Sequence, residues 1–262
     1  MPTILIINDD GINSIGLSTI AKQLRKLGEV LVVTPRDEKS GIGKAISIGQ
    51  VNITETDFDD GIKAYAITGT PADSFLIAVN KILKHMPDLL VSGINMGPNL
   101  GIDDLLTSGT VGAAFEAAIH KVPAIAVSYC ISEITSKMPE KTKISAKDLE
   151  LAATLAYKAA KHVLERGMPP EVQIISINVP EKADSKNVKL TSLCYDGYGD
   201  IHTAEKDGYR IKSWALRHYP DGGPGTDLHA IKTDRCISVT PIKVEFVHNT
   251  EAMKELLKSL SA

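Results

Sequence analysis

The sequence predicts an α/β fold in which a parallel sheet carries helices on both faces. Short aliphatic runs alternate along the chain with longer segments whose apolar residues have helical spacing. The aliphatic runs are apolar throughout, as in strands that are covered on both faces. A chain of 262 residues with 43% hydrophobic residues can also bury a large core. We therefore expect a Rossmann-like three-layer arrangement whose ligands bind beyond the carboxyl ends of the strands.

Five strands and four helices make up this expected core. The strands begin at Thr3 (TILII), Val30 (VLVVT), Asp88 (DLLVSG), Pro123 (PAIAVS) and Val172 (VQIISIN). The helices are expected over about residues 14–27, 71–84, 109–120 and 145–166. The second helix has a complete start signal, with Thr70 as the cap, Pro71 in the first position and Asp73 at the favourable end of the helix dipole.

Two antiparallel excursions interrupt the alternating pattern. Residues 46–68, which include the turn FDDG, predict a small hairpin. From about residue 185 the segment YRIKSWAL predicts a second hairpin, followed by the turn-rich HYPDGGPGTD, the strand CISVTPI and a last helix. We expect residues 1–184 to form the Rossmann-like core and residues 185–262 to form an extension of the same continuous domain.

Composition excludes several classes of partner. The net charge of -3 and the absence of basic blocks argue against binding of polymeric nucleic acid. No apolar run approaches the roughly 20 residues of a membrane span, and the start MPTILIIN lacks the features of a signal peptide. Cys130, Cys194 and Cys236 are odd in number and widely spaced, which favours buried, reduced thiols. We therefore expect a cytoplasmic protein that binds no membrane.

Asp9 and Asp10 are adjacent carboxylates that directly follow the first strand, in ILIINDDGIN. Two carboxylates this close repel each other unless a proton, a cation or solvent separates them. One interpretation is a polar turn that Gly11 relaxes. The other is a site for a hard cation such as Mg²⁺ or Mn²⁺, which prefers oxygen ligands.

The loop DEKSGIGKA follows the strand that ends near Thr34. It is not a Walker A motif, because Glu38 stands where that motif has glycine and Ala45 stands where it has serine or threonine. The loop presents the hydroxyl of Ser40, and three cations nearby could contact an anion: Arg36, Lys39 and Lys44. For Lys39 we favour simple solvation.

Two further stretches combine small and polar residues. VSGINMGPNLG predicts an irregular loop after an apolar strand, with Asn95 and Asn99 as neutral oxygen donors or as local turn formers. In TSGTVGAAFEAAIH, Ser108 or Thr110 is expected to cap a helix whose open first turn could attract phosphate. Close helix packing is expected from the small residues that follow: Ala113, Ala114, Ala117 and Ala118.

The five stretches ILIINDDGIN, KSGIGKAIS, GTPADS, VSGINMGPNLG and SGTVGAAFEAA, in this order and at these separations, resemble the SurE family of survival proteins. The similarity continues through INVP near Asn178 and through GTDLHA and ISVTPI, so it covers nearly the whole chain. The resemblance implies a metal-dependent phosphatase of nucleoside monophosphates. Within that class it implies a 5'-nucleotidase that releases nucleoside and inorganic phosphate, with 3'-monophosphates as a further substrate class.

The resemblance also implies roles for individual residues. Asp9 and Asp10 are expected to be catalytic and, together with Ser40 and Asn95, to bind one divalent cation per subunit, Mg²⁺ or Mn²⁺. The phosphate is expected to lie beside Asn95 and the SGT segment, which comprises Ser108, Gly109 and Thr110.

The resemblance further implies an oligomer. We expect a homodimer or homotetramer, in which the hairpin or the last helix of residues 185–262 packs on a partner. The last helix has a stripe that could instead cover its own core: Ala252, Met253, Leu256, Leu257 and Leu260.

Two departures from the family pattern concern the substrate. Thr107 stands where the family commonly has tyrosine, and Thr191-Ser192 stands in place of the usual TR. Two other functions remain open from sequence. One is a metal- and nucleotide-binding sensor without turnover, and the other is a haloacid-dehalogenase-like phosphatase with an aspartyl nucleophile, whose DxD spacing is missing here.

Overall fold

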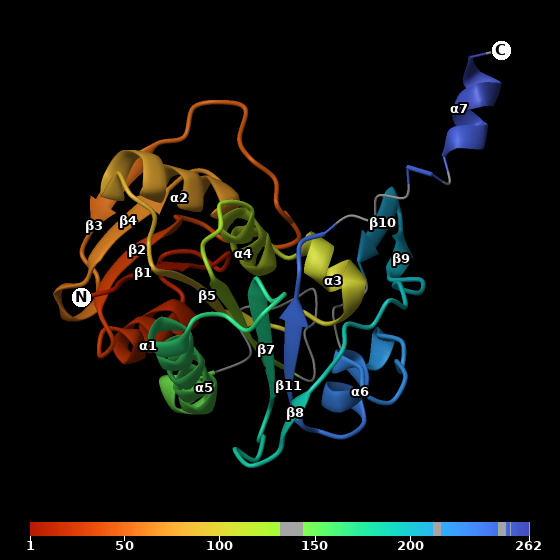
Figure 1. Ribbon diagram of the computed structural model, residues 1–262. Coiled ribbons are helices and arrows are strands. Elements are labelled where there is room, and N and C mark those ends of the chain that lie inside the picture. The colour runs from red at the N-terminus through yellow and green to blue at the C-terminus, as the bar shows by residue number, and fades with distance from the viewer. Residues whose placement is uncertain (132–143, 212–215, 246–249, 252, 262) are drawn as a thin grey trace.

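The computed structural model describes residues 1–131, 144–211, 216–245, 250–251 and 253–261 (Figure 1). Its centre is a nine-stranded sheet in the order β3-β4-β2-β1-β5-β6-β7-β11-β8. The strands of this sheet are β1 (Thr3–Ile7), β2 (Glu29–Pro35), β3 (Ile53–Thr56), β4 (Lys63–Ile67), β5 (Leu89–Met96), β6 (Ala124–Cys130), β7 (Ile174–Pro180), β8 (Val188–Leu190) and β11 (Ile237–Ile242).

Helices cover both faces of this sheet, which confirms the predicted three-layer α/β architecture. Alternate residues of the central strand β1 point to opposite layers. Ile4 and Ile6 pack against the layer of α1 (Ile15–Leu24) and α5 (Ala146–Arg166). Leu5 and Ile7 pack against the layer of α2 (Pro71–Ile77) and α4 (Gly109–Ile119), and the four alanines of α4 are part of that buried layer.

The central strands run parallel and in register. Ile4 pairs with Val30 of β2 on one side and with Leu89 of β5 on the other. Because the strands are parallel, the residues that follow β1, β2 and β5 meet at one edge of the sheet. Asp9 and Asp10 lie at this edge, directly after β1.

The antiparallel excursions are partly as predicted. β3 pairs antiparallel with β4, but β4 also pairs parallel with β2 and so belongs to the main sheet. The hairpin of β9 (His202–Glu205) and β10 (Gly208–Ile211) is present, although residues 212–215 of the YRIKSWAL segment lie outside the described residues. The predicted final strand is β11, which pairs antiparallel with β7.

Three elements were not predicted from the sequence: β8, α3 (Gly101–Thr107) and α6 (Asp227–Lys232). Asn95 was expected in a loop, but β5 continues to Met96 with a register irregularity between Ser92 and Asn95. The last helix, α7 (Lys254–Leu260), buries none of its residues and projects away from the sheet (Figure 1). Its apolar stripe therefore does not cover a core of its own chain; Ala252 lies outside the described residues.

Candidate active site

The turn after β1 is fixed by side-chain hydrogen bonds. Asn8 is fully buried and accepts a 2.5 Å hydrogen bond from the Thr34 hydroxyl at the end of β2, while its own amide donates to Gly11 O at 3.2 Å. Gly11 has φ +94°, and a Cβ there would lie 3.0 Å from the carbonyl oxygen of Arg36. Glycine therefore allows the turn to adopt a left-handed conformation directly beneath the loop that follows β2.

Asp9 is buried and faces the start of α4. Its Oδ1 accepts a 2.6 Å hydrogen bond from the Thr110 hydroxyl. A Cβ on Gly109 would lie only 2.8 Å from the Asp9 Cβ, so glycine permits this close approach. Burial raises the pKa of the Asp9 carboxyl, and hydrogen bonds from Thr110 offset part of that rise.

Asp10 turns to the neighbouring strand. Its Oδ2 accepts a hydrogen bond of 3.3 Å from the Met96 amide at the end of β5. Burial raises the pKa of Asp10 well above its usual range, and the negative charges of Asp9 and Glu38 raise it further. The paired carboxylates thus favour binding of a proton or a cation, because no basic side chain of the described residues is among the groups that shift their pKa values.

The Ser40 loop is held to the site by two backbone hydrogen bonds. The Lys39 amide donates to Asp9 O at 2.7 Å, and the Gly43 amide donates to Thr107 O at 2.7 Å. Ser40 lies between these two points, is exposed, and donates its hydroxyl to Glu38 Oε1 at 2.5 Å. A single rotation of this hydroxyl would present its oxygen to another ligand.

Two of the three cations near this loop have carboxylate partners. Arg36 pairs with Asp37 at 2.8 Å. Lys44 forms an ion pair with Glu116, a buried residue of α4. Lys44 therefore links the loop to α4. The sequence suggested an anion contact for Lys44 and did not predict this ion pair.

Asn95 lies beside Asp10 in the last residues of β5. It is half-buried, and its amide nitrogen donates to Gly97 O at 3.0 Å. Among the described residues nothing donates a hydrogen bond to Asn95 Oδ1 or to Asp10 Oδ1. Both oxygens are therefore available to a ligand.

Ser108 caps α4, as one of the two sequence alternatives predicted. Its hydroxyl accepts a 3.1 Å hydrogen bond from the Val111 amide. Thr110 is also buried, but its hydroxyl bonds Asp9. Both hydroxyls that were expected at a phosphate thus have protein partners, and the Gly109 and Thr110 amides donate to the Asp9 carboxyl. What this segment offers an anion is the positive end of the α4 dipole.

The structure brings all seven predicted site residues to one edge of the sheet through these contacts: Asp9, Asp10, Ser40, Asn95, Ser108, Gly109 and Thr110. In the described part of the chain no group of three or more His, Cys, Asp or Glu is placed to hold a metal. A cation here would therefore depend on the neutral oxygens of Ser40 and Asn95 beside the two carboxylates. This all-oxygen donor set fits a hard divalent cation.

A buried carboxylate behind the site was missed from the sequence. Asp104 of α3 accepts hydrogen bonds from the hydroxyls of Tyr198 and Tyr219, the latter at 2.9 Å, and from the Leu100 amide at 3.0 Å. Burial raises the pKa of Asp104 to about 7. Asp104 O also accepts the Ser108 amide at 2.8 Å, so this cluster supports the start of α4. The sequence feature that could have indicated this support is an acidic residue, Asp104, four residues before the helix cap Ser108.

The two departures from the expected pattern lie in different surroundings. Thr107 is exposed, and its hydroxyl donates to Asp103 O at 2.9 Å and lies 3.4 Å from the Tyr198 hydroxyl. Thr191 is buried, 2.7 Å from the Ser238 hydroxyl and 2.8 Å from the Thr240 hydroxyl. Thr107 therefore borders the site, whereas Thr191 belongs to a buried hydroxyl cluster on β11.

Comparisons with known proteins extend over nearly the whole chain. A family model described as Survival protein SurE matches residues 4–200. The chain is 37% identical over 252 residues to the 5'-nucleotidase SurE of Methanosarcina mazei, which covers 94% of this chain and 93% of that protein. It is 38% identical over 249 residues to the 5'-nucleotidase SurE of Methanococcus maripaludis, which covers 92% of each. The crystal structure of the Sure protein from Aquifex aeolicus matches with a TM-score of 0.75 and 29% identity over 100% of both chains.

Proposed function

This chain belongs to the SurE survival-protein family, and from that membership we infer that it is a 5'-nucleotidase that hydrolyses nucleoside monophosphates to nucleoside and inorganic phosphate. One structural observation supports this inference: the carboxylates Asp9 and Asp10 lie beside the start of α4. A site for a phosphoryl group needs positive potential beside groups that can hold a cation. Both are present at this edge of the sheet.

We propose that Asp9, Asp10, Ser40 and Asn95 hold one divalent cation per subunit, Mg²⁺ or Mn²⁺. When bound, such an ion supplies charge neutralisation at the phosphoryl oxygens and activates water. The donor set supports this assignment because it consists of oxygens alone. Oxygen-only sites do not distinguish strongly between these two metals, so both are expected to support activity.

The chain's own groups bind and orient the substrate. The positive end of the α4 dipole, at Gly109, attracts the negative phosphoryl group. Thr110 holds Asp9 in one orientation through its hydroxyl. Ser108 caps the helix and so keeps its first turn in place.

A phosphate-release assay tests the activity. We expect release from nucleoside 5'-monophosphates, loss of release in excess EDTA, and recovery on addition of Mg²⁺ or Mn²⁺. Steady turnover excludes a sensor that only binds nucleotide. Undiminished turnover in EDTA would refute the metal assignment, and no release from any nucleoside monophosphate would refute the nucleotidase.

We propose that the chain forms a homodimer through its carboxyl-terminal elements, with a homotetramer as the larger alternative. Leu256, Leu257 and Leu260 of α7 are 48%, 65% and 76% exposed, and the helix projects from the body of the chain (Figure 1). Tyr209 of the β9–β10 hairpin is also exposed. Apolar side chains gathered on a projecting helix are typical of a contact with a second copy.

We propose a cytoplasmic location. The three cysteines are buried and unpaired, as is usual in a reducing compartment. Within the described ranges, none of the helices has the length and apolarity needed to cross a membrane.

A further inference from the structure

The Ser40 loop, residues 39–45, runs along one face of α4. Gly109 and Gly112 are three residues apart and therefore lie on the same face of this helix. A Cβ on Gly109 would lie 3.0 Å from Cγ2 of Ile42, and a Cβ on Gly112 would lie 2.4 Å from the carbonyl oxygen of Gly43. The loop thus follows the helix from its first turn toward its second.

Glu116 continues this face of α4 by one more turn and contacts the next residue of the loop. It is only 5% exposed, and its two carboxylate oxygens have different partners. Oε1 lies 3.1 Å from Nε2 of His120. Oε2 pairs with Nζ of Lys44, and no group in the described part of the chain donates a hydrogen bond to this oxygen. The charge of a buried carboxylate therefore depends on Lys44 for its compensation.

The other attachments of the Ser40 loop are single hydrogen bonds. Beside the two backbone bonds at Lys39 and Gly43, the Ala45 carbonyl oxygen accepts the Thr70 hydroxyl at 2.6 Å. Between Ser40 and Lys44 the chain contains two glycines with left-handed backbone, which give it conformational freedom there. Among the described contacts of this loop, the ion pair of Lys44 is the one that joins a charged side chain to α4.

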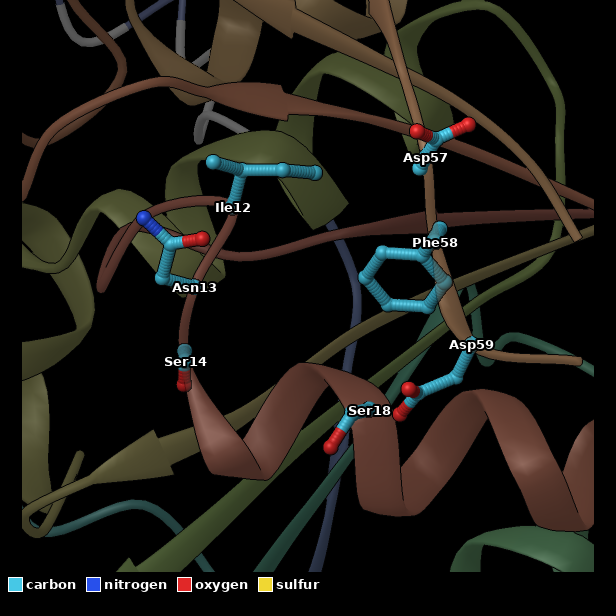
Figure 2. A pocket seen from close by; sticks show the side chains of 7 residues that line it. All are labelled: Ile12, Asn13, Ser14, Ser18, Asp57, Phe58 and Asp59. Atoms are coloured by element: carbon cyan, nitrogen blue, oxygen red, sulfur yellow. The ribbon is translucent and has the colours of Figure 1, made fainter.

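The opposite face of the sheet edge gives the Ser40 loop no comparable support. There, a cavity of about 480 Å³ lies beside the start of α1. Figure 2 shows Ile12 and Asn13 on one side of this cavity and Asp57 and Phe58 on the other. Its lining includes no residue of the Ser40 loop or of α4. The described support of the loop therefore comes from Asp9 and from the helices on the α4 side.

We propose that Lys44 and Glu116 are positioning residues for the metal site. Their ion pair holds the Ser40 loop against α4, so that the Ser40 hydroxyl stays beside Asp9 and Asp10 before the cation arrives. A ligand that is already in place loses less conformational freedom when the ion binds. The proposal rests on the proposed role of Ser40 as a metal ligand, and it adds two residues that do not themselves touch the ion.

Titration of the substrate-free protein with Mn²⁺, followed by the electron paramagnetic resonance signal of the free ion, measures the Kd directly. Lys44→Met keeps the length of the side chain and removes its charge. It should raise the Kd about fivefold, less than the tenfold or more expected for a group that contacts a metal ligand directly. Electrostatics alone predicts the opposite sign, because removal of a positive charge near a cation site strengthens binding. Lys44→Arg keeps the charge pair and should restore most of the affinity.

A double variant separates position from stability. Lys44→Met leaves the Glu116 charge buried without compensation, which should lower the thermal midpoint. In Lys44→Met/Glu116→Gln this charge is gone and the contact with His120 can persist, so the thermal midpoint should recover most of the loss. The link between loop and helix is still absent in the double variant, so its Kd for Mn²⁺ should stay raised.

Lys39→Met is the matched control. It makes the same charge change one residue from Ser40, its side chain has no ion pair within the described ranges, and its backbone bond to Asp9 O is retained. Its Kd for Mn²⁺ should not rise, because no link to α4 is lost.

Each outcome decides a different claim. An unchanged or lower Kd in Lys44→Met would overturn the positioning role, and so would an equal rise in Lys39→Met. A Kd that returned to the wild-type value together with the thermal midpoint in the double variant would also overturn it, since the loss would then reflect instability alone. Absence of Mn²⁺ binding by the wild type would refute the metal assignment itself, and this proposal with it.

Discussion

The hydroxyl of Thr110 donates a 2.6 Å hydrogen bond to Oδ1 of Asp9, although 101 residues separate the two in sequence. Asp9 follows β1, and Thr110 lies in the first turn of α4. Both residues are buried. The bond therefore fixes the Asp9 carboxylate from a second element, independently of the turn to which it belongs.

Thr110→Val keeps the shape of the side chain and removes this donor. We expect the affinity for the activating metal to fall about tenfold, the lower end of the effect seen when a partner of a metal ligand is removed. Titration of kcat with Mn²⁺ measures the change, and Thr110→Ser should restore most of it. A rise in KM for AMP at unchanged metal affinity would instead place the Thr110 hydroxyl on the phosphate, as the sequence resemblance implied.

Asp9→Asn and Asp10→Asn should each abolish most activity without unfolding the chain. Each substitution removes a negative charge that the cation needs, while it preserves size. In EDTA the thermal midpoint should hold or rise, because burial and mutual repulsion already disfavour the two charges. Wild-type turnover in either variant would show that Asp9 and Asp10 form only a polar turn and bind no catalytic metal.

Asp104 should make the metal-free protein less stable as pH rises from about 4 to about 7. Its pKa is raised from 3.8 to about 7 on folding, so between these values the folded state holds a proton that the unfolded state has lost. Stability is then greatest below about pH 4 and decreases until pH reaches about 7, where Asp104 ionises in the folded state too, by up to about 4 kcal/mol in total at roughly 1.4 kcal/mol per pKa unit.

Urea unfolding in EDTA at several pH values, with Asp104→Asn beside the wild type, isolates this contribution. The comparison is needed because Asp9 and Asp10 act in the same direction, and because Tyr198, Tyr219 and Asp227 all influence Asp104. The variant should have the shallower pH dependence. Parallel curves would show that Asp104 does not titrate in this range.

Truncation after Glu245 should convert the proposed dimer to a monomer. The removed segment contains α7, which buries no residue in its own chain, so the remaining fold should keep its thermal midpoint. Light scattering at micromolar concentration gives the mass of both forms. A full-length chain that already scatters as a monomer would contradict the proposal.

The regular elements could be predicted where local sequence alone determines them. α2 begins at Pro71 because Thr70 and Asp73 form a capping box, whose bonds of 3.1 and 2.9 Å involve neighbours only. β1 is a run of five buried residues, and its apolar pattern is visible without any knowledge of the fold. The residues within or next to such an element are therefore enough to predict it.

Other elements depend on distant partners. α3 has no capping side chain at Leu100, and its first amide, that of Gly101, donates to Asp227 at 2.9 Å from 126 residues away. The sequence therefore predicts only the irregular stretch VSGINMGPNLG before this helix, and not the helix itself. The same reason explains why Thr110 was expected at the phosphate, because its bond to Asp9 exists only after β1 and α4 have packed together.

The placement of Ser40 has a consequence for how this segment can diverge among relatives. Backbone atoms hold the loop at Lys39 and Gly43, and a Cβ on Gly112 would lie 2.4 Å from the Gly43 carbonyl oxygen. The loop is thus held in part by main-chain contacts. Any residue but proline can donate the amide at position 39, whereas Gly43 has φ +58° and a Cβ there would lie 2.6 Å from the Leu106 carbonyl oxygen. Substitutions at the exposed neighbours Ala45 and Ile46 should therefore accumulate freely over evolutionary time. Gly112 should resist replacement, because any side chain there would push the Ser40 loop away from the first turn of α4.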